Sequence, residues 1–182
     1  MKKILLLITL LTMPLLGYTI ESATDYSNYF SDGKSYGQSF TSLNAGQISK
    51  MKVGAANSPA GPFTVDFFQG EYAAGSTPIA SITFTFDGSN TYKEYEVNPP
   101  IAISANTVYS FRLSEGIANV FYSAGKYSGG KVCIDGDWSN LNYQNQDLNF
   151  VITVAEVTPE APTLSTVQPS AVSYTTVQSG GE

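Results

Sequence analysis

Residues 98–113 read NPPIAISANTVYSFRL, which is two short apolar runs joined by a polar turn. Apolar side chains lie two residues apart in both runs, the period of a half-buried strand: Ile101 and Ile103, then Tyr109, Phe111 and Leu113. The prolines at 99 and 100 remove two amide donors, so the first strand should lie at the edge or corner of a sheet. The stretch therefore predicts two strands that form a hairpin.

The rest of the chain repeats this pattern of short alternating runs between turns rich in Gly, Asn, Ser and Pro. In residues 47–53 the alternation breaks once, and a β-bulge near Ser49 would restore one apolar face. Residues 82–86 and 92–97 flank the hairpin signal Asp-Gly-Ser-Asn. About ten such strands without a helical period predict an all-β chain, folded as an antiparallel β-sandwich.

The chain begins with the basic residues of Met-Lys-Lys, followed by an apolar run that ends at Leu16. The run is too short to cross a bilayer as a helix and is typical of a secretory signal peptide. Cleavage after Gly17 and cleavage after Ala23 both fit, although neither site is a clean Ala-x-Ala. The alternative is a buried N-terminal helix.

Four segments are expected along the chain. They are a signal peptide with the start of the mature chain over 1–23, the β-sandwich over 24–157, a proline-rich linker over 158–163, and the incomplete start of a second β domain over 164–182. The linker is stiffened by its prolines. The last segment has room for one hairpin at most, which is not stable alone, so we expect the natural protein to continue into downstream domains.

Charge and composition exclude several partners. Removing residues 1–17 takes away two lysines and leaves seven basic against fifteen acidic residues, a net charge of −8. Nothing in the sequence forms a basic patch for phosphates, so nucleic acid and anionic membrane surfaces are poor candidate partners. Charged residues make up only 13% of the chain, while Tyr and Phe total 22. This balance suits a domain that is secreted or displayed on a cell surface.

The single cysteine, Cys133, rules out a disulfide within the chain. In a secreted protein it either pairs with a cysteine of another chain or fills apolar space inside the short strand at 131–134. Stability must then come from burial of a core, for which the folded body is large enough.

Catalytic chemistry has little support. The chain has no histidine, which excludes Ser-His-Asp and Cys-His catalysis and histidine-bound zinc. Glu94 and Glu96 share one strand face, and paired carboxylates are what glycoside hydrolysis needs. Their face is otherwise polar, so we interpret them as a solvated outer face and expect no enzyme.

A calcium site is a further hypothesis. Asp135 and Asp137 flank a glycine, and Asp147 could join them from the following strand. Carboxylate and carbonyl oxygens are the ligands that calcium takes, but the spacing of an EF-hand is absent. The alternative is an ordinary Asp-Gly turn.

Carbohydrate binding needs flat apolar surface beside polar groups, because sugar rings carry C–H faces as well as hydroxyls. The candidate residues lie in and before the long polar loop over 135–146: Trp138, Asn140 and Tyr143 within it, and Tyr122 and Tyr127 ahead of it. The alternative is that Trp138 plugs one end of the sandwich and that the tyrosines form an amphipathic rim.

Several short motifs occur in an order that resembles a known module. They are GQSFT at 37–41, GQI at 46–48 with Met51 and Val53, NTVYSF at 106–111, YSGG at 127–130 and DLNF at 147–150. Over residues 36–154 the chain resembles an exported, jelly-roll-like β-sandwich module of surface and secreted multidomain proteins of Bacteroidota. Residues 163–182 resemble the start of a fibronectin type III-like repeat. In this resemblance Gln38, Phe40, Asp147 and Phe150 are structural positions.

The resemblance implies a non-catalytic module of adhesins or polysaccharide-handling proteins. We therefore expect an extracellular binding or adhesion module for a polysaccharide or glycoconjugate, with no membrane insertion once the signal peptide is removed. The rival hypothesis is a structural spacer that presents downstream domains and binds no small ligand. Neither hypothesis needs a cofactor other than the calcium ion considered above.

Overall fold

The fold was obtained as a computed structural model. It describes residues 17–22, 28–30, 34–56, 59–88, 91–113, 119–124, 127–140, 143 and 145–157. Residues 1–16, the linker over 158–163 and the expected second unit over 164–182 lie outside the described residues. Within the described ranges, no helix is long and apolar enough to span a membrane.

The described residues form twelve β-strands, which confirms the predicted all-β class. The strands are β1 Tyr18–Glu21, β2 Asn28–Phe30, β3 Tyr36–Thr41, β4 Gly46–Ala55, β5 Gly61–Gln69, β6 Ala80–Phe86, β7 Thr91–Ile103, β8 Val108–Leu113, β9 Val120–Ala124, β10 Val132–Ile134, β11 Gln146–Leu148 and β12 Phe150–Ala155.

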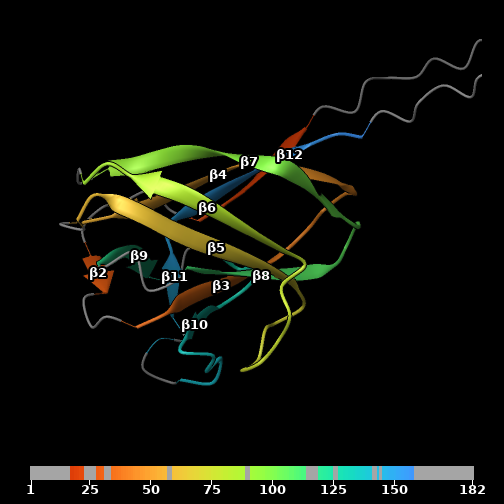
Figure 1. The fold of residues 1–182 in the computed structure, drawn as a ribbon. Helices are drawn as coiled ribbons and strands as arrows, with labels where there is room; N and C mark the ends of the chain where they lie inside the picture. The colour runs from red at the N-terminus through yellow and green to blue at the C-terminus, as the bar shows by residue number, and fades with distance from the viewer. Residues whose placement is uncertain are drawn as a thin grey trace, which may run out of the picture.

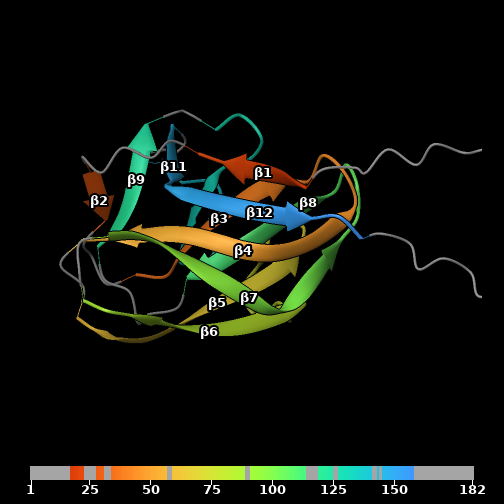
Figure 2. The ribbon, with the colours of Figure 1, turned by 90° about the horizontal axis from the view of Figure 1, so that it is seen from above.

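Two antiparallel sheets pack face to face, so the predicted β-sandwich is also confirmed (Figure 1). The seven-stranded sheet has the order β1-β12-β4-β9-β11, with β2 paired to β9 and β7 paired to β4. The five-stranded sheet has the order β10-β3-β8-β5-β6. Viewed from above, β7 and β6 form one side of the sandwich, and β1 lies at the opposite side (Figure 2).

The core lies between the sheets and is rich in aromatic rings. Alternate residues of each strand point inward, as the period of two requires. The largest fully buried side chains come from both sheets: Tyr36, Phe40, Phe63, Phe67, Phe111 and Leu113 from one, Ile48, Met51, Leu148, Phe150 and Ile152 from the other. Phe40 therefore faces inward, and the chain needs no disulfide to assemble this core.

The two runs of residues 98–113 do not form the predicted hairpin. The first run belongs to β7 in the seven-stranded sheet, and the second run is β8 in the five-stranded sheet. Ile103 and Phe111 are both buried, and they reach the core from opposite sides. Both strands therefore bury their alternate apolar residues in the same core, although the two strands do not pair with each other.

The hairpin predicted from residues 82–86 and 92–97 is also wrong, because its two strands belong to different sheets. β6 pairs with β5, and β7 pairs with β4, so the turn after Phe86 carries the chain from one sheet to the other. By contrast, the predicted bulge is present. Lys50 pairs with Thr153 and Ile48 pairs with Val154, which leaves Ser49 as the extra residue on β4.

Gln38, on β3, links the two sheets through the core. Its side chain is fully buried. The amide Nε2 donates to Asp147 Oδ1 at 3.0 Å, and the Leu148 backbone N–H donates to Gln38 Oε1 at 3.0 Å. The Tyr127 N–H donates to the other carboxylate oxygen of Asp147 at 3.1 Å. A buried polar group is tolerated only when it is bonded in this way.

The seven-stranded sheet begins earlier than residue 24, where the sandwich was expected to start. β1 pairs along β12 from Tyr18 opposite Val154 to Glu21 opposite Val151. Its apolar residue Ile20 is buried in the core. The described part of the sandwich therefore starts at β1.

Gln38→Leu tests the link between the sheets. The substitution keeps the volume but leaves the buried carboxylate of Asp147 and the N–H of Leu148 without these partners, so we expect the free energy of unfolding to fall by about 2–4 kcal/mol. Urea unfolding measures it. Gln47→Leu, at a half-buried position of β4, is the matched control and should change stability by less than about 0.5 kcal/mol. Equal effects of the two substitutions would contradict the role assigned to Gln38.

Tyr95, on β7, lies among aromatic rings, with Phe84 at 4.9 Å and Phe63 at 5.3 Å between ring centroids. Its hydroxyl is buried and has no hydrogen-bond partner among the described residues. Burial, with a smaller contribution from the charge of Asp87, raises the pKa of Tyr95 from 10.0 to about 12. The folded chain therefore holds this proton more tightly than the unfolded chain does.

The protein should lose stability in alkali as a result. The contribution of Tyr95 is fully present below pH 10.0 and is lost as the pH rises toward about 12, because only the unfolded chain releases the proton in that window. Urea unfolding between pH 8 and 12 should show this decline, and Tyr95→Phe should reduce its slope. At pH 7 the variant should be at least as stable, since the hydroxyl makes no bond among these residues. An unchanged slope would refute the assignment.

Candidate functional site

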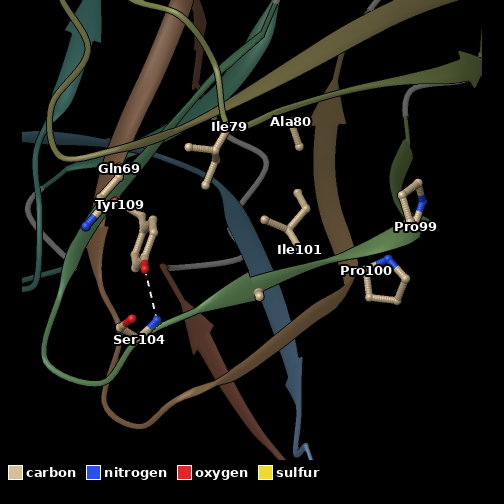
Figure 3. A pocket seen from close by; sticks show the side chains of 9 residues that line it. Gln69, Ile79, Ala80, Pro99, Pro100, Ile101, Ser104 and Tyr109 are labelled. Atoms are coloured by element: carbon tan, nitrogen blue, oxygen red, sulfur yellow. Dashed lines mark hydrogen bonds between the residues drawn. The ribbon is translucent and has the colours of Figure 1, made fainter.

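The site that the fold builds is a groove of about 430 Å³ between the diverging strands β6 and β7. It lies where the free edges of the two sheets separate, and Figure 3 shows Ile79 and Ile101 on its opposite sides. Nine residues line it: Gln69, Ile79, Ala80, Pro99, Pro100, Ile101, Ala102, Ser104 and Tyr109. Its volume is within the range of small-molecule sites in proteins.

The groove exists because β7 departs from β4 at its proline pair. Lys50 pairs with Glu96 and Ile48 pairs with Ile101, so four residues of β7 lie opposite the single residue Ser49. Two of these four are Pro99 and Pro100, which have no amide hydrogen for the ladder. Both prolines are exposed and form part of the wall. The prediction that they lie at a sheet edge is confirmed.

The walls of the groove are apolar, with a few polar groups at defined places. Ile79 is 47% exposed and presents an aliphatic side chain to the groove. The Tyr109 hydroxyl accepts a hydrogen bond from the Ser104 backbone N–H at 2.9 Å (Figure 3), which leaves its own hydrogen to donate. Gln69 adds an exposed amide.

None of the nine lining residues carries a charge at neutral pH. The groove therefore suits a neutral ligand with both apolar surface and hydroxyl groups. The sequence did not predict this groove, because the hairpin expected over 98–113 would have placed β7 and β8 in one sheet. The proline pair was the signal that could have located it.

Trp138, the strongest sequence candidate, is half-buried. Its indole Nε1–H donates to the Tyr72 carbonyl oxygen at 2.6 Å, and its ring meets the Tyr72 ring edge-on at 5.1 Å. The Lys131 ammonium lies 6.0 Å from the ring centroid. These contacts use the polar end of the indole and much of its surface, so the ring is structurally held, although not at one end of the sandwich, where the alternative interpretation placed it.

Trp138 belongs to a small cluster on the outer face of the five-stranded sheet, with Phe68, Tyr72 and Cys133. Cys133 is fully buried there, which confirms the apolar filler and removes it from contact with other chains. Burial also raises the pKa of its thiol. The Arg112 guanidinium lies over the Phe68 and Tyr72 rings, at 5.5 and 5.6 Å.

The tyrosine candidates lie in other surroundings. Tyr122 stacks on Phe30 at 4.2 Å, and Tyr143 meets the same ring edge-on at 5.4 Å. The backbone carbonyl of Asn140 accepts a hydrogen bond from the Tyr143 N–H, which closes a turn in the loop.

Tyr127 packs edge-on against Phe150 at 5.3 Å, and its hydroxyl accepts a hydrogen bond from the Thr41 N–H at 3.2 Å. The same ring lines a separate hollow of about 340 Å³ beside β1. The structure therefore distributes the five sequence candidates over several local environments and does not gather them in one site.

The predicted calcium ligands are not brought together. Within the part of the chain that the structure describes, no group of three or more His, Cys, Asp or Glu residues could hold a metal ion. Asp147 is buried against Gln38, as described above. Asp135 accepts a hydrogen bond from the Ser35 N–H at 3.0 Å, and Asp137 accepts one from the Ser139 N–H at 2.8 Å.

Asp135 and Gly136 both have positive φ, and the backbones of Ile134 and Asp137 exchange hydrogen bonds. This is the ordinary two-residue Asp-Gly turn.

Glu94 and Glu96 form the exposed outer face that the sequence predicted. The Lys50 ammonium bonds to both carboxylates, at 3.0 and 3.1 Å. Hydrogen bonds to the two glutamates, Glu94 first, raise the pKa of Lys50. Lys50, Glu94 and Glu96 therefore form an exposed network of ion pairs on the outer face of the sheet.

No protein-family model matches the chain, and no curated protein does either.

Trp138→Ala separates a structural role from a ligand contact. If the indole has a structural role, the substitution should lower the free energy of unfolding by about 2–4 kcal/mol, because the ring and its hydrogen bond are both lost. Urea unfolding measures the change. Tyr29→Ala removes an aromatic ring that is 46% exposed, and as the control it should cost less than about 1 kcal/mol. Unchanged stability of Trp138→Ala would overturn the assignment.

Proposed function

We propose that this chain is an exported, non-catalytic binding module that takes a neutral carbohydrate in the groove between β6 and β7. The observation that supports this is the lining of the groove, with apolar walls, one amide and two hydroxyl side chains, and no charged residue. The apolar surfaces of Ile79 and the two prolines match the C–H faces of a sugar ring. In this proposal Gln69, Ser104 and the free hydroxyl hydrogen of Tyr109 form hydrogen bonds with hydroxyls of the sugar.

The rival role is a structural spacer that presents downstream domains and binds no small ligand. Here Tyr18 pairs with Val154, so β1 begins at the end of the sandwich where β12 finishes (Figure 2). This arrangement favours a domain attached at one end, with its other surfaces free for binding, on a secreted or cell-surface protein.

The proposal is tested with the full chain on an array of neutral glycans and on insoluble polysaccharides, followed by titration calorimetry of any ligand found. Ile79→Lys places an ammonium group on the apolar wall and should weaken binding at least about tenfold. Gln69→Ala removes one hydrogen-bonding amide and should weaken binding about three- to tenfold.

Val108→Lys is the matched control, because Val108 is a similarly exposed aliphatic residue, at 42%, that does not line the groove. It should bind as the unmodified chain does. Binding that is unaffected by Ile79→Lys would place the ligand elsewhere. Failure to bind any neutral glycan would favour the spacer.

A further inference from the structure

We infer that export of this protein cleaves the peptide bond between Gly17 and Tyr18, so that the mature chain begins with β1. The inference rests on the export that is part of the proposed function, and on where the structure places residues 18–22. The sequence alone left cleavage after Gly17 and cleavage after Ala23 open. The structure distinguishes them, because only the first leaves β1 in the mature protein.

β1 is an integral edge strand of the seven-stranded sheet. All four of its residues pair with β12, which would otherwise present a free edge to solvent. Ile20 is only 4% exposed and belongs to the main core. Cleavage after Ala23 would remove this side chain and leave its space in the core empty.

Ser22 closes the connection between β11 and β12. Its backbone N–H donates to the Phe150 carbonyl oxygen at 3.1 Å. Its hydroxyl donates to the Leu148 carbonyl oxygen and accepts from the Phe150 N–H at 3.2 Å. Leu148 and Phe150 are fully buried, so loss of Ser22 would leave buried backbone groups without these partners.

Tyr18, the first residue after the inferred cleavage, is also held in place. Its hydroxyl donates to the Asn44 carbonyl oxygen at 2.6 Å and accepts from the Asn44 N–H at 3.3 Å. Gly17 itself, although exposed, also packs against β12, since a Cβ added to it would lie 2.6 Å from the Val154 carbonyl oxygen. The inference therefore rests on the pairing and burial of residues 18–22, and not on where the contacts of the domain end.

The chemistry of leader removal favours the same bond. Cleavage sites carry small residues before the bond, and a charged residue three positions before it departs from the Ala-x-Ala pattern. Gly17 is small, with the apolar Leu15 two residues earlier, whereas Ala23 has the charged Glu21 at that place. A leader peptidase would hydrolyse the C–N bond: the oxygen of a water molecule joins the Gly17 carbonyl carbon to give a carboxylate, and the Tyr18 nitrogen takes a proton and leaves as an amine.

The experiment is export of the full chain with its own leader from a bacterium, followed by intact mass and N-terminal sequencing. We expect Tyr18 as the first residue. Gly17→Leu enlarges the residue before the bond and should reduce cleavage there more than tenfold, whereas the matched variant Ala23→Leu should be processed as the unmodified chain is. A first residue other than Tyr18, or a leader that stays uncleaved, would overturn the inference.

A stability measurement on the exported protein gives an independent answer. Ile20→Ala should lower the melting temperature by about 5–15 °C if β1 is retained, and the exposed neighbour Thr19→Ala should change it by less than about 2 °C. Equal melting temperatures for the two variants would show that β1 is absent from the mature protein. This result does not depend on whether the groove binds a carbohydrate.

Discussion

The buried amide of Gln38 holds the two sheets at a fixed separation, because its backbone belongs to β3 while its side chain bonds to β11. A glutamine in an aromatic core is stable only if each polar atom finds a partner, and the Asp147 carboxylate and the Leu148 N–H meet that requirement. The same carboxylate receives the Tyr127 N–H, so the residues before β10 are fixed by the bond that joins the sheets. Apolar contacts could slide by one residue, but this set of bonds specifies a single register.

The groove at the other side of the sandwich follows from a second local constraint. β7 is the longest strand of the described residues, and the turn at either end of it joins the two sheets. At its proline pair it leaves the ladder of β4, while β6 continues in the five-stranded sheet. The separation of the two edges exposes Ile79 and leaves Tyr109 with a hydrogen to donate. The topology therefore produces a groove, which β7 and the end of the connection between β5 and β6, over residues 70–79, line together.

Much of the fold could be predicted from the period of two, because alternation reports which residues are buried. It correctly indicated that Phe40 faces inward and that Ser49 is the extra residue of a bulge. It could not indicate which sheet a strand joins, since β7 and β8 bury their apolar faces in the same core from opposite sides. The accessibility of aromatic residues was harder to predict. Trp138 is aromatic and has polar neighbours in the sequence, and only the fold shows that Tyr72 covers it.

The prolines of β7 also affect how copies of this domain can crowd together. An exposed edge strand is a template on which a neighbouring chain can add a strand. Pro99 and Pro100 have no amide hydrogens to offer, and Ser49 opposite them marks the point where the ladder is already broken. A neighbouring copy cannot form ladder hydrogen bonds with the two prolines, so they shorten the stretch of this edge on which a strand could be added.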